Sequence, residues 1–146
     1  MIERARGRGV YDELERAELT AFLEGHPDRF DLIVSADTLV YFGPLEPVLA
    51  AAAGALRPGG WLIVTVEEAA GGSAPEGYRI NPHGRYSHRR DYVALALERS
   101  GLVAAAIEPA VLRNEGGSPV HGLVVSARKP ESMTGADAAA PGRRQP

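Results

Sequence analysis

The sequence contains no cysteine, and this absence removes three kinds of chemistry at once. Disulfide bonds, thiolate metal sites and a cysteine nucleophile all need a residue that the chain does not have. Positive charge is not in excess either, because the formal net charge is -3 at pH 7. A chain without a basic field is not drawn as a whole onto nucleic acid or anionic lipid, so nucleic acid is not an expected partner.

A long hydrophobic run and a targeting signal are also missing. The longest apolar stretch, residues 45–56, contains Glu46, Pro47 and Gly54 and is too short to span a bilayer. The N-terminus has no apolar signal region. We therefore expect a cytoplasmic protein without a membrane segment, with one domain over residues 1–129 and a disordered tail over residues 130–146.

Several catalytic motifs are absent as well. The sequence has no Gly-x-Ser-x-Gly elbow, no phosphate-loop lysine and no His-Glu-x-x-His pattern. The spacing of His83 and His88 does not match a pair of metal ligands on a helix. Serine hydrolysis and a metal site are therefore not expected.

The residues that are present predict alternating strands and helices. Residues 30–35 and 61–66 are continuous apolar runs, typical of parallel strands covered on both faces. An amphipathic helix is expected between them, ended by Pro58 and the two glycines that follow it. Strand, helix and strand in this order predict a right-handed crossover and a parallel pair, with residues 30–35 in the centre of the sheet.

Shorter elements are expected on both sides of this unit. They are the end of a helix at residues 1–8, a strand at 10–14, helices at about 19–24 and 89–99, and antiparallel strands at 103–107 and 122–127. Residues 67–86, rich in glycine, proline and polar side chains, are expected to form a functional loop, with a lid as one use. The predicted fold is α/β, with a mostly parallel sheet, helices on both faces and a C-terminal antiparallel hairpin.

Two blocks of the sequence resemble a known family. The runs FDLIVSADTL at residues 30–39 and ALRPGG at residues 55–60 resemble the fourth-strand to fifth-strand region of class I, Rossmann-like methyltransferases that depend on S-adenosylmethionine. Residues 84–92 resemble a subgroup of predicted methyltransferases often attached to tetratricopeptide repeats, although no such repeat occurs here. The resemblance implies S-adenosylmethionine as cofactor and methyl transfer to an unknown substrate nucleophile.

The resemblance also implies cofactor-binding positions. Glu18 matches the acidic residue that binds the adenine amino group, with Leu19 beside the ring, and a helix-capping glutamate is the alternative. Ala36 and Asp37 match the segment that faces the methionine part of the cofactor and the substrate. Asp37 is therefore a candidate for catalysis too, and a turn cap is its alternative role.

Four residues are candidates for substrate binding, namely Tyr41, Arg85, Tyr86 and His88. Tyr41 either walls a substrate pocket or closes the core. Arg85 and His88 belong to a basic stretch that either clamps an acidic group or forms a solvated loop face. His88 precedes an expected helix, where a neutral imidazole is favoured, and this makes it a second candidate for catalysis, as a base.

One part of the family pattern is missing. The glycine-rich cofactor loop and the ribose-binding acid have no match, and residues 7–9 are no substitute because they follow a helix rather than a strand. We therefore expect a C-terminal portion of the fold without its cofactor-loop unit, and an exposed sheet edge that could pair with another chain. Two other functions stay open: a non-catalytic remnant acting as an interaction module, and an oxidoreductase, although the Tyr-x-x-x-Lys pair of the latter is absent.

Overall fold

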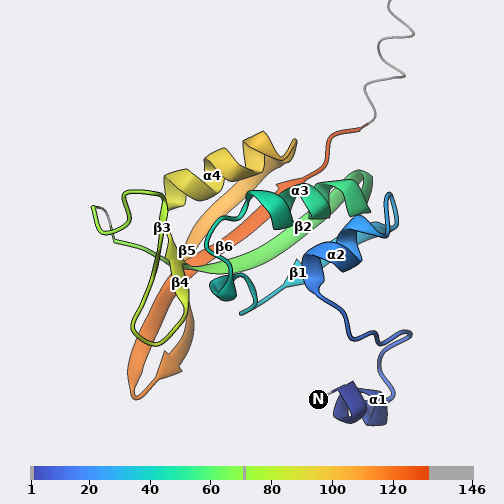
Figure 1. Ribbon diagram of the computed structural model, residues 1–146, viewed down its shortest axis with the longest axis horizontal. Coiled ribbons are helices and arrows are strands. Elements are labelled where there is room, and N and C mark those ends of the chain that lie inside the picture. Colours follow the sequence, from blue (N-terminus) through green and yellow to red (C-terminus); the bar gives the residue numbers. More distant parts are fainter. Residues whose placement is uncertain (1, 71, 132–146) are drawn as a thin grey trace, which may run out of the picture.

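The computed structural model describes residues 2–70 and 72–131, which form a mixed α/β fold around a six-stranded sheet (Figure 1). Its elements in chain order are α1 (Ile2–Arg8), α2 (Leu19–Glu24), β1 (Phe30–Ser35), the 3-10 turn η1 (Leu39–Tyr41), α3 (Glu46–Ala55), β2 (Leu56–Glu68), β3 (Tyr78–Ile80), β4 (Tyr86–His88), α4 (Arg90–Arg99), β5 (Val103–Glu115) and β6 (Ser118–Arg128). Within the described ranges, every helix is too short or too polar to cross a membrane.

The β1–α3–β2 unit forms as predicted. β1 and β2 pair in parallel, with Leu32 beside Trp61 and Ser35 beside Val64. α3 ends at Ala55 and β2 begins at Leu56, and the register with β1 shifts between Leu56 and Trp61, where two glycines follow Pro58. Gly59 adopts the left-handed region, with φ 84°, and a side chain on Gly60 would lie only 3.0 Å from the carbonyl oxygen of Asp31. The glycine pair therefore allows the sharp turn and the close approach of the two strands.

The prediction of a mostly parallel sheet is wrong. β2 pairs in parallel with β1 and β4, whereas β2–β6, β3–β4 and β5–β6 are antiparallel. The physical reason is that the connections from β3 to β4 and from β5 to β6 are too short for a crossover, so each pair forms an antiparallel hairpin. In the described part of the chain no strand precedes β1, so β1 lies at an edge of the sheet and not in its centre.

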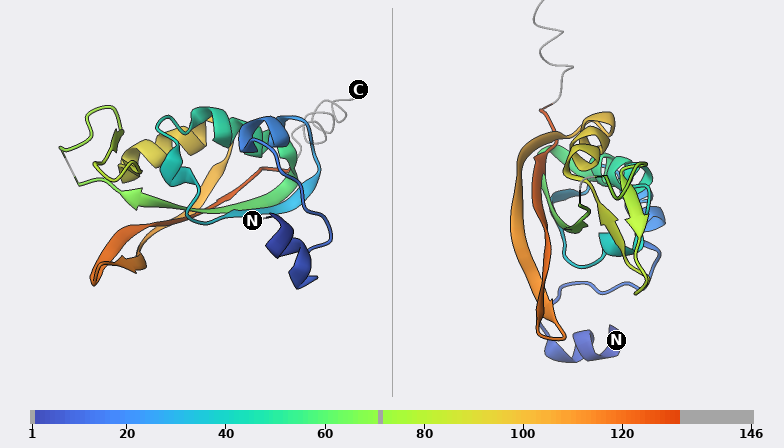
Figure 2. Two further views of the ribbon diagram at one scale, coloured as in Figure 1. Left: turned by 60° about the horizontal axis from the view of Figure 1, so that its bottom comes forward. Right: turned by 90° about the vertical axis from the view of Figure 1, so that its left-hand side faces the viewer.

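The helices α2, α3 and α4 lie on the same face of the sheet (Figure 2), so the prediction of helices on both faces is wrong for the described residues. Leu62, Val64 and Val66 of β2 point to the helices and are at most 3% exposed. Leu32 and Val34 of β1 point to the other face and are 53% and 62% exposed. A crossover between parallel strands is almost always right-handed. The handedness of the β1–α3–β2 crossover therefore determines on which face of the sheet α3 lies.

The predicted C-terminal hairpin is confirmed, and its strands are longer than expected. β5 and β6 pair from Val103–Arg128 to Glu115–Ser118. The turn consists of Gly116 and Gly117, both with positive φ, which is the conformation of a two-residue turn between twisted strands. The hairpin therefore extends past the helices as a two-stranded arm (Figure 1).

Three further predictions concern short segments. No strand forms at residues 10–14, where Val10 and Tyr11 are 72% and 56% exposed and no strand lies beside them. Residues 67–86 are not one loop, because β3 lies within them and β4, which begins at Tyr86, extends the sheet beside the end of β2. Pro130 and Glu131 have no regular structure, and the rest of the expected tail lies outside the described residues.

Candidate functional site

The carboxyl ends of β1 and β2 meet at one edge of the sheet, where open α/β sheets bind their ligands. The chain leaves β1 through Ala36 and Asp37, and Asp37 has a φ of 54°. Its backbone N–H donates to Oγ1 of Thr65 on β2, at 3.1 Å. A non-glycine residue held in the left-handed region costs free energy, and such residues gather at binding sites. The backbone of Asp37 is therefore held in a defined position at the candidate site.

Arg113 of β5 joins three carboxylates at this edge. Its Nη1 donates to Oδ1 of Asp37 at 2.7 Å, its Nε donates to Oε1 of Glu115 at 2.8 Å, and its Nη2 donates to Glu67. The hydrogen bond from Arg113 to Glu115 raises the pKa of Arg113 and lowers the pKa of Glu115. Arg113 was not predicted from the sequence, although it joins the ends of β1, β2 and β5.

Arg85 completes the network from the segment before β4. Its Nε donates to Oε2 of Glu67 at 3.1 Å, and its Nη2 donates to both oxygens of Glu115 at 2.6 Å. Glu67, at the end of β2, is only 5% exposed. Two guanidinium groups compensate this buried carboxylate, which would otherwise be strongly destabilising.

A pocket of about 210 Å³ opens beside this network, lined by Asp37, Val40, Tyr41, Arg85 and Arg113. The structure thus brings together three predicted residues, Asp37, Tyr41 and Arg85. Tyr41 stands at the rim, 65% exposed. Because the guanidinium groups are already bonded to carboxylates, an acidic ligand would have to replace the half-exposed side chains of Asp37 or Glu115.

A second, more apolar pocket of about 190 Å³ lies between α2, β1 and α3. Leu19 lines it at one end, and Ser35 and Thr38, on either side of Asp37 in the chain, also line it. The predicted cofactor residue Leu19 therefore shares a pocket with the segment that carries Asp37. Residues 35–38 contribute to both pockets.

Glu18 caps α2, which is the alternative that the sequence analysis named for it. Its two oxygens accept hydrogen bonds from the backbone N–H groups of Thr20 and Ala21, both at 2.9 Å. The bonds from Ala21 and Thr20 lower the pKa of the Glu18 carboxyl. The carboxylate is ionised and exposed at the start of α2, next to Leu19.

His88 and Tyr86, the other predicted substrate residues, do not join Tyr41 and Arg85 at the pocket. His88 is fully buried, and its Nε2 donates to the carbonyl oxygens of Phe42 and Gly43, both at 2.9 Å. Its Nδ1 is buried without a partner among the described residues. Burial lowers the pKa of His88, so the ring is neutral as expected. This position makes it a support for the turn at residues 42–43 and leaves no access for a substrate.

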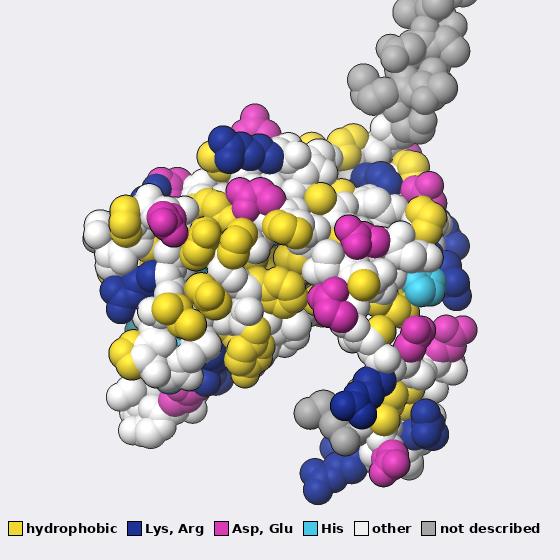
Figure 3. All heavy atoms as spheres, in the orientation of Figure 1, with side chains coloured by type: hydrophobic (Ala, Val, Ile, Leu, Met, Phe, Trp, Pro, Cys, Tyr) yellow, Lys and Arg dark blue, Asp and Glu magenta, His cyan; other side chains and the backbone are white. Residues whose placement is uncertain are grey.

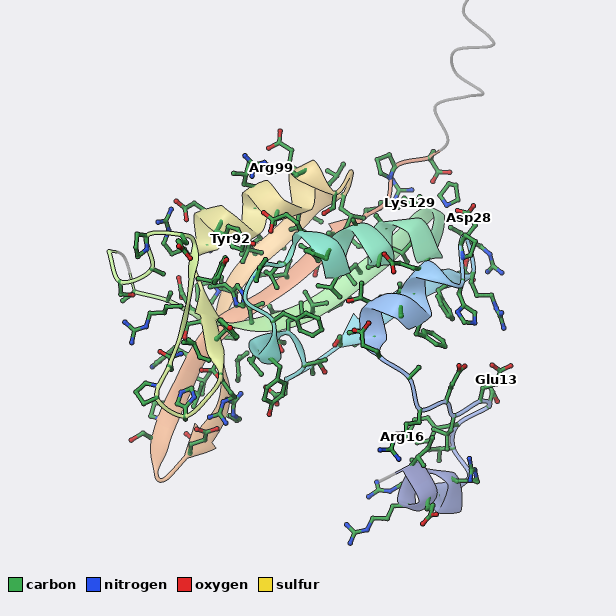
Figure 4. All side chains as sticks on the ribbon, viewed as in Figure 1. Glu13, Arg16, Asp28, Tyr92, Arg99 and Lys129 are labelled. Carbon is green, nitrogen blue, oxygen red and sulfur yellow. The ribbon has the colours of Figure 1, made fainter. Side chains whose placement is uncertain are left out.

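Tyr86 packs in an aromatic cluster beneath the same turn. Its ring lies 6.1 Å from that of Tyr78, and a side chain added to Gly43 would come within 3.2 Å of both rings. Tyr92 of α4 belongs to this cluster and points toward the start of α3 (Figure 4). Its hydroxyl donates to Glu46 at 2.6 Å and accepts from the N–H of Leu45 at 2.9 Å. Burial raises the pKa of Tyr92 to about 12.

Figure 3 shows the distribution of charge on one face of the molecule. On the face drawn in Figure 3, acidic and basic side chains are interspersed among hydrophobic ones. Among the described residues, no three histidine or carboxylate side chains come close enough to hold a metal ion. The carboxyl edge of β1 and β2 is therefore the arrangement on which a functional proposal can be based.

Comparison with models of protein families finds no match, and comparison with curated proteins finds none either. Solved structures do match. The chain is similar to an S-adenosylmethionine-dependent methyltransferase from Methanosarcina mazei, with a TM-score of 0.66 and 16% identity over 89% of this chain and 76% of that one. It is also similar to 1,6-didemethyltoxoflavin-N1-methyltransferase from Burkholderia thailandensis with bound S-adenosylhomocysteine (TM-score 0.57, 22% identity, 72% of this chain, 46% of that one).

A third similar structure is the [4+2]-cyclase SpnF, with a TM-score of 0.69 and 17% identity over 89% of this chain and 61% of that one. Identities this low show the fold alone. The chain therefore has the fold of class I methyltransferases, and it spans between 46% and 76% of the length of these three proteins. Because one of these three proteins is a cyclase, the shared fold does not determine which reaction is catalysed.

Proposed function

We propose that the chain binds S-adenosylmethionine at the carboxyl ends of β1 and β2 and takes part in methyl transfer to a substrate nucleophile. The observation that carries this proposal is the position of Asp37. It lines the pocket of Tyr41, Arg85 and Arg113, while its neighbours Ser35 and Thr38 line the apolar pocket of Leu19. One short segment therefore borders two adjacent sites, as transfer between two ligands requires.

The residues present fit the cofactor in part. Leu19 and the apolar pocket offer a surface for the purine ring, and Glu18 lies beside it with an exposed carboxylate. The carboxylate of Asp37, half-exposed, suits the ammonium group of the methionine part. Glu18, Leu19, Ala36 and Asp37 are thus the residues that would hold it. When bound, the cofactor supplies an electrophilic methyl group.

The chain would contribute to the reaction by positioning the two reactants and not by transferring a proton. Asp37 is bonded to Arg113, and His88 is buried away from the pocket, so neither is placed as a free base. Tyr41 would form one wall for the acceptor, and the Arg113–Glu67–Arg85 network would hold the strand ends still. Orientation of two reactants can supply much of the acceleration of a transfer reaction. We therefore infer an acceptor that is nucleophilic at neutral pH.

A non-catalytic interaction module is the second candidate. The observation that favours it is the exposure of Leu32, Val34 and Trp61 on the sheet face without helices, beside the free edge of β1. This function needs no cofactor, so cofactor binding separates the two candidates.

Calorimetric titration of the chain with S-adenosylmethionine tests the proposal, after circular dichroism has confirmed that the chain is folded. We expect saturable binding that is weakened at least about tenfold in Asp37→Asn, because the carboxylate contact is lost. Asp31→Asn is the matched control, since Asp31 lies in β1 and also bonds one arginine, Arg57, but lines neither pocket. It should bind as the unchanged chain does. A folded chain without saturable binding would contradict the proposal and favour the interaction module.

A further inference from the structure

The segment that leaves β1 is held in an unusual conformation. Asp37 has a φ of 54°, in the left-handed region that residues other than glycine enter only at a cost in free energy. Ala36 and Asp37 are both exposed, so close packing of their side chains does not impose this conformation. The hydrogen bonds that reach Asp37 from neighbouring strands are therefore what stabilises it.

Thr65 of β2 supplies the bond to the backbone. The ladder between β1 and β2 ends with Ser35 beside Val64, so Thr65 is the first residue of β2 beyond this ladder. Its Oγ1 accepts a hydrogen bond from the backbone N–H of Asp37 at 3.1 Å. The Thr65 hydroxyl thus extends the attachment of β1 to β2 past the point where the paired residues end.

Thr65 is well suited to hold a neighbouring segment in place. β2 pairs with β6 as well as with β1, and Thr65 itself lies beside Val124 of β6, so the sheet fixes its backbone. Its side chain is partly buried within the strand. Threonine is branched at Cβ, which restricts rotation about χ1 and with it the position of the hydroxyl.

Arg113 of β5 fixes the side chain of the same aspartate. Its Nη1 donates to Oδ1 of Asp37 at 2.7 Å. Among the residues that the structure describes, none donates to Oδ2, and the side chain of Asp37 is 53% exposed. Because the N–H and Oδ1 are both bonded, Oδ2 is the atom that remains for a ligand, and bonds from β2 and β5 determine where it points.

We propose that Thr65 is a positioning residue for the cofactor, because it holds the backbone of Asp37 in the conformation that presents Oδ2 to an ammonium group. This inference rests on the proposed function, in which Asp37 contacts the methionine part of S-adenosylmethionine. Thr65 lines neither pocket at the carboxyl edge, so it acts through Asp37. A carboxylate that is already in place binds more tightly than one that must be ordered during binding.

Three variants separate the hydroxyl of Thr65 from the shape of its side chain. Thr65→Val keeps the shape and removes the acceptor, whereas Thr65→Ser keeps the acceptor. Ser126→Ala is the matched control, because Ser126 of β6 lies beside Ile63, on the same face of the sheet as Thr65, and lines neither pocket. Thr65→Val should fold normally, since valine favours strands and the exposed N–H of Asp37 can bond to water. Circular dichroism checks the fold of each variant.

Amide hydrogen exchange followed by NMR measures the bond without any cofactor. The N–H of Asp37 should exchange at least about tenfold faster in Thr65→Val than in the unchanged chain, because its acceptor is lost. Thr65→Ser and Ser126→Ala should retain the slow rate. An Asp37 N–H that exchanges equally fast in Thr65→Val and in the unchanged chain overturns the proposal.

Calorimetric titration with S-adenosylmethionine measures the consequence for binding. Thr65→Val should bind about fivefold more weakly, whereas Thr65→Ser and Ser126→Ala should bind as the unchanged chain does. When Asp37→Asn is already present, Thr65→Val should cause no further loss, because the carboxylate through which Thr65 acts is gone. An equal loss with and without Asp37→Asn would mean that Thr65 supports the fold in general, and this result overturns the proposal.

The outcomes also separate this inference from the function on which it rests. A folded, unchanged chain that does not bind S-adenosylmethionine contradicts the proposed function and, with it, the role of Thr65 toward the cofactor. Saturable binding that Asp37→Asn weakens and Thr65→Val leaves intact contradicts the role of Thr65 alone.

Discussion

Arg113 and Asp37 lie 76 residues apart in the sequence, and Nη1 of Arg113 donates to Oδ1 of Asp37 at 2.7 Å. The bond connects the β5–β6 arm to the end of β1, at the opposite border of the β1–β2–β6–β5 part of the sheet. Because the same guanidinium group also holds Glu67 and Glu115, the geometry of the candidate site depends on how far β5 extends. The hairpin is therefore part of the site and not only a border of the sheet.

Replacement of Arg113 by alanine should destabilise the chain by about 2 to 4 kcal/mol, because Glu67 would remain buried with one of its two cationic partners removed. Urea unfolding followed by circular dichroism measures this change. Arg57→Ala is the control, since Arg57 forms one exposed pair with Asp31, and it should cost less than about 1 kcal/mol. Equal losses in the two variants would contradict the central role of Arg113.

The stability of the chain should fall as the pH is lowered below about 6.5, owing to His88. Burial lowers the pKa of His88 in the folded state, so below the unfolded pKa of about 6.5 the unfolded chain binds more protons. The stabilisation is complete above that pH and is lost as the pH falls toward the folded pKa, by at most about 1.4 kcal/mol for each pH unit.

Urea unfolding at several pH values between about 7.5 and 5.5 measures the His88 effect. His88→Gln keeps a donor for the carbonyl oxygens of Phe42 and Gly43 but cannot titrate, so its stability should vary less with pH. His121→Gln, at an exposed position, should retain the slope of the unchanged chain. Glu115 and Asp91, with pKa values below their ordinary ones, do not titrate in this range. An unchanged slope in His88→Gln would contradict the assignment.

Local signals in the sequence predict much of the fold. β1, α3 and β2 follow from apolar runs and from the helix-ending Pro58 and glycines, and the C-terminal hairpin follows from its glycine turn. The direction of most strand pairs and the bare face of the sheet could not be predicted, because they depend on pairing between distant segments. The resemblance to methyltransferases was needed to select Asp37 from among many exposed carboxylates.

Arg113 and His88 illustrate the limit of prediction at the site. The first hairpin strand was expected to end at Ile107, yet β5 continues through Pro109 to Glu115. A proline is tolerated there because β5 is an edge strand, whose outward N–H groups have no partner to lose. His88 was predicted at a substrate site because it belongs to a basic stretch just before a helix. A three-residue strand such as β4 has too few residues to show a pattern, and its pairing with β2 buries the ring.

Tyr92→Phe should destabilise the chain by about 1 to 2 kcal/mol, because the N–H of Leu45 loses its acceptor at the start of α3. Tyr41→Phe is the control at an exposed position and should have almost no effect. Spectrophotometric titration gives an independent measurement, since one of the five tyrosines should ionise near pH 12 in the unchanged chain and be absent from that titration in Tyr92→Phe. If the tyrosine that is lost in Tyr92→Phe does not ionise near pH 12 in the unchanged chain, the burial of the Tyr92 hydroxyl is contradicted.

Two glycine substitutions should change stability in opposite directions. A side chain on Gly122 would overlap the carbonyl oxygen of Val66 and the side chain of Leu112, so Gly122→Ala should force β6 away from β2 and cost about 3 kcal/mol or more. Gly54 lies inside α3 with open space around it, so Gly54→Ala should stabilise the chain by about 0.5 to 1 kcal/mol through the better helix propensity of alanine. Thermal unfolding of both variants measures the difference.

Because β6 joins β2 to the arm that carries Arg113, Gly122→Ala should also weaken any cofactor binding, whereas Gly54→Ala should leave it unchanged. A stable Gly122→Ala protein would contradict the close approach of the two strands.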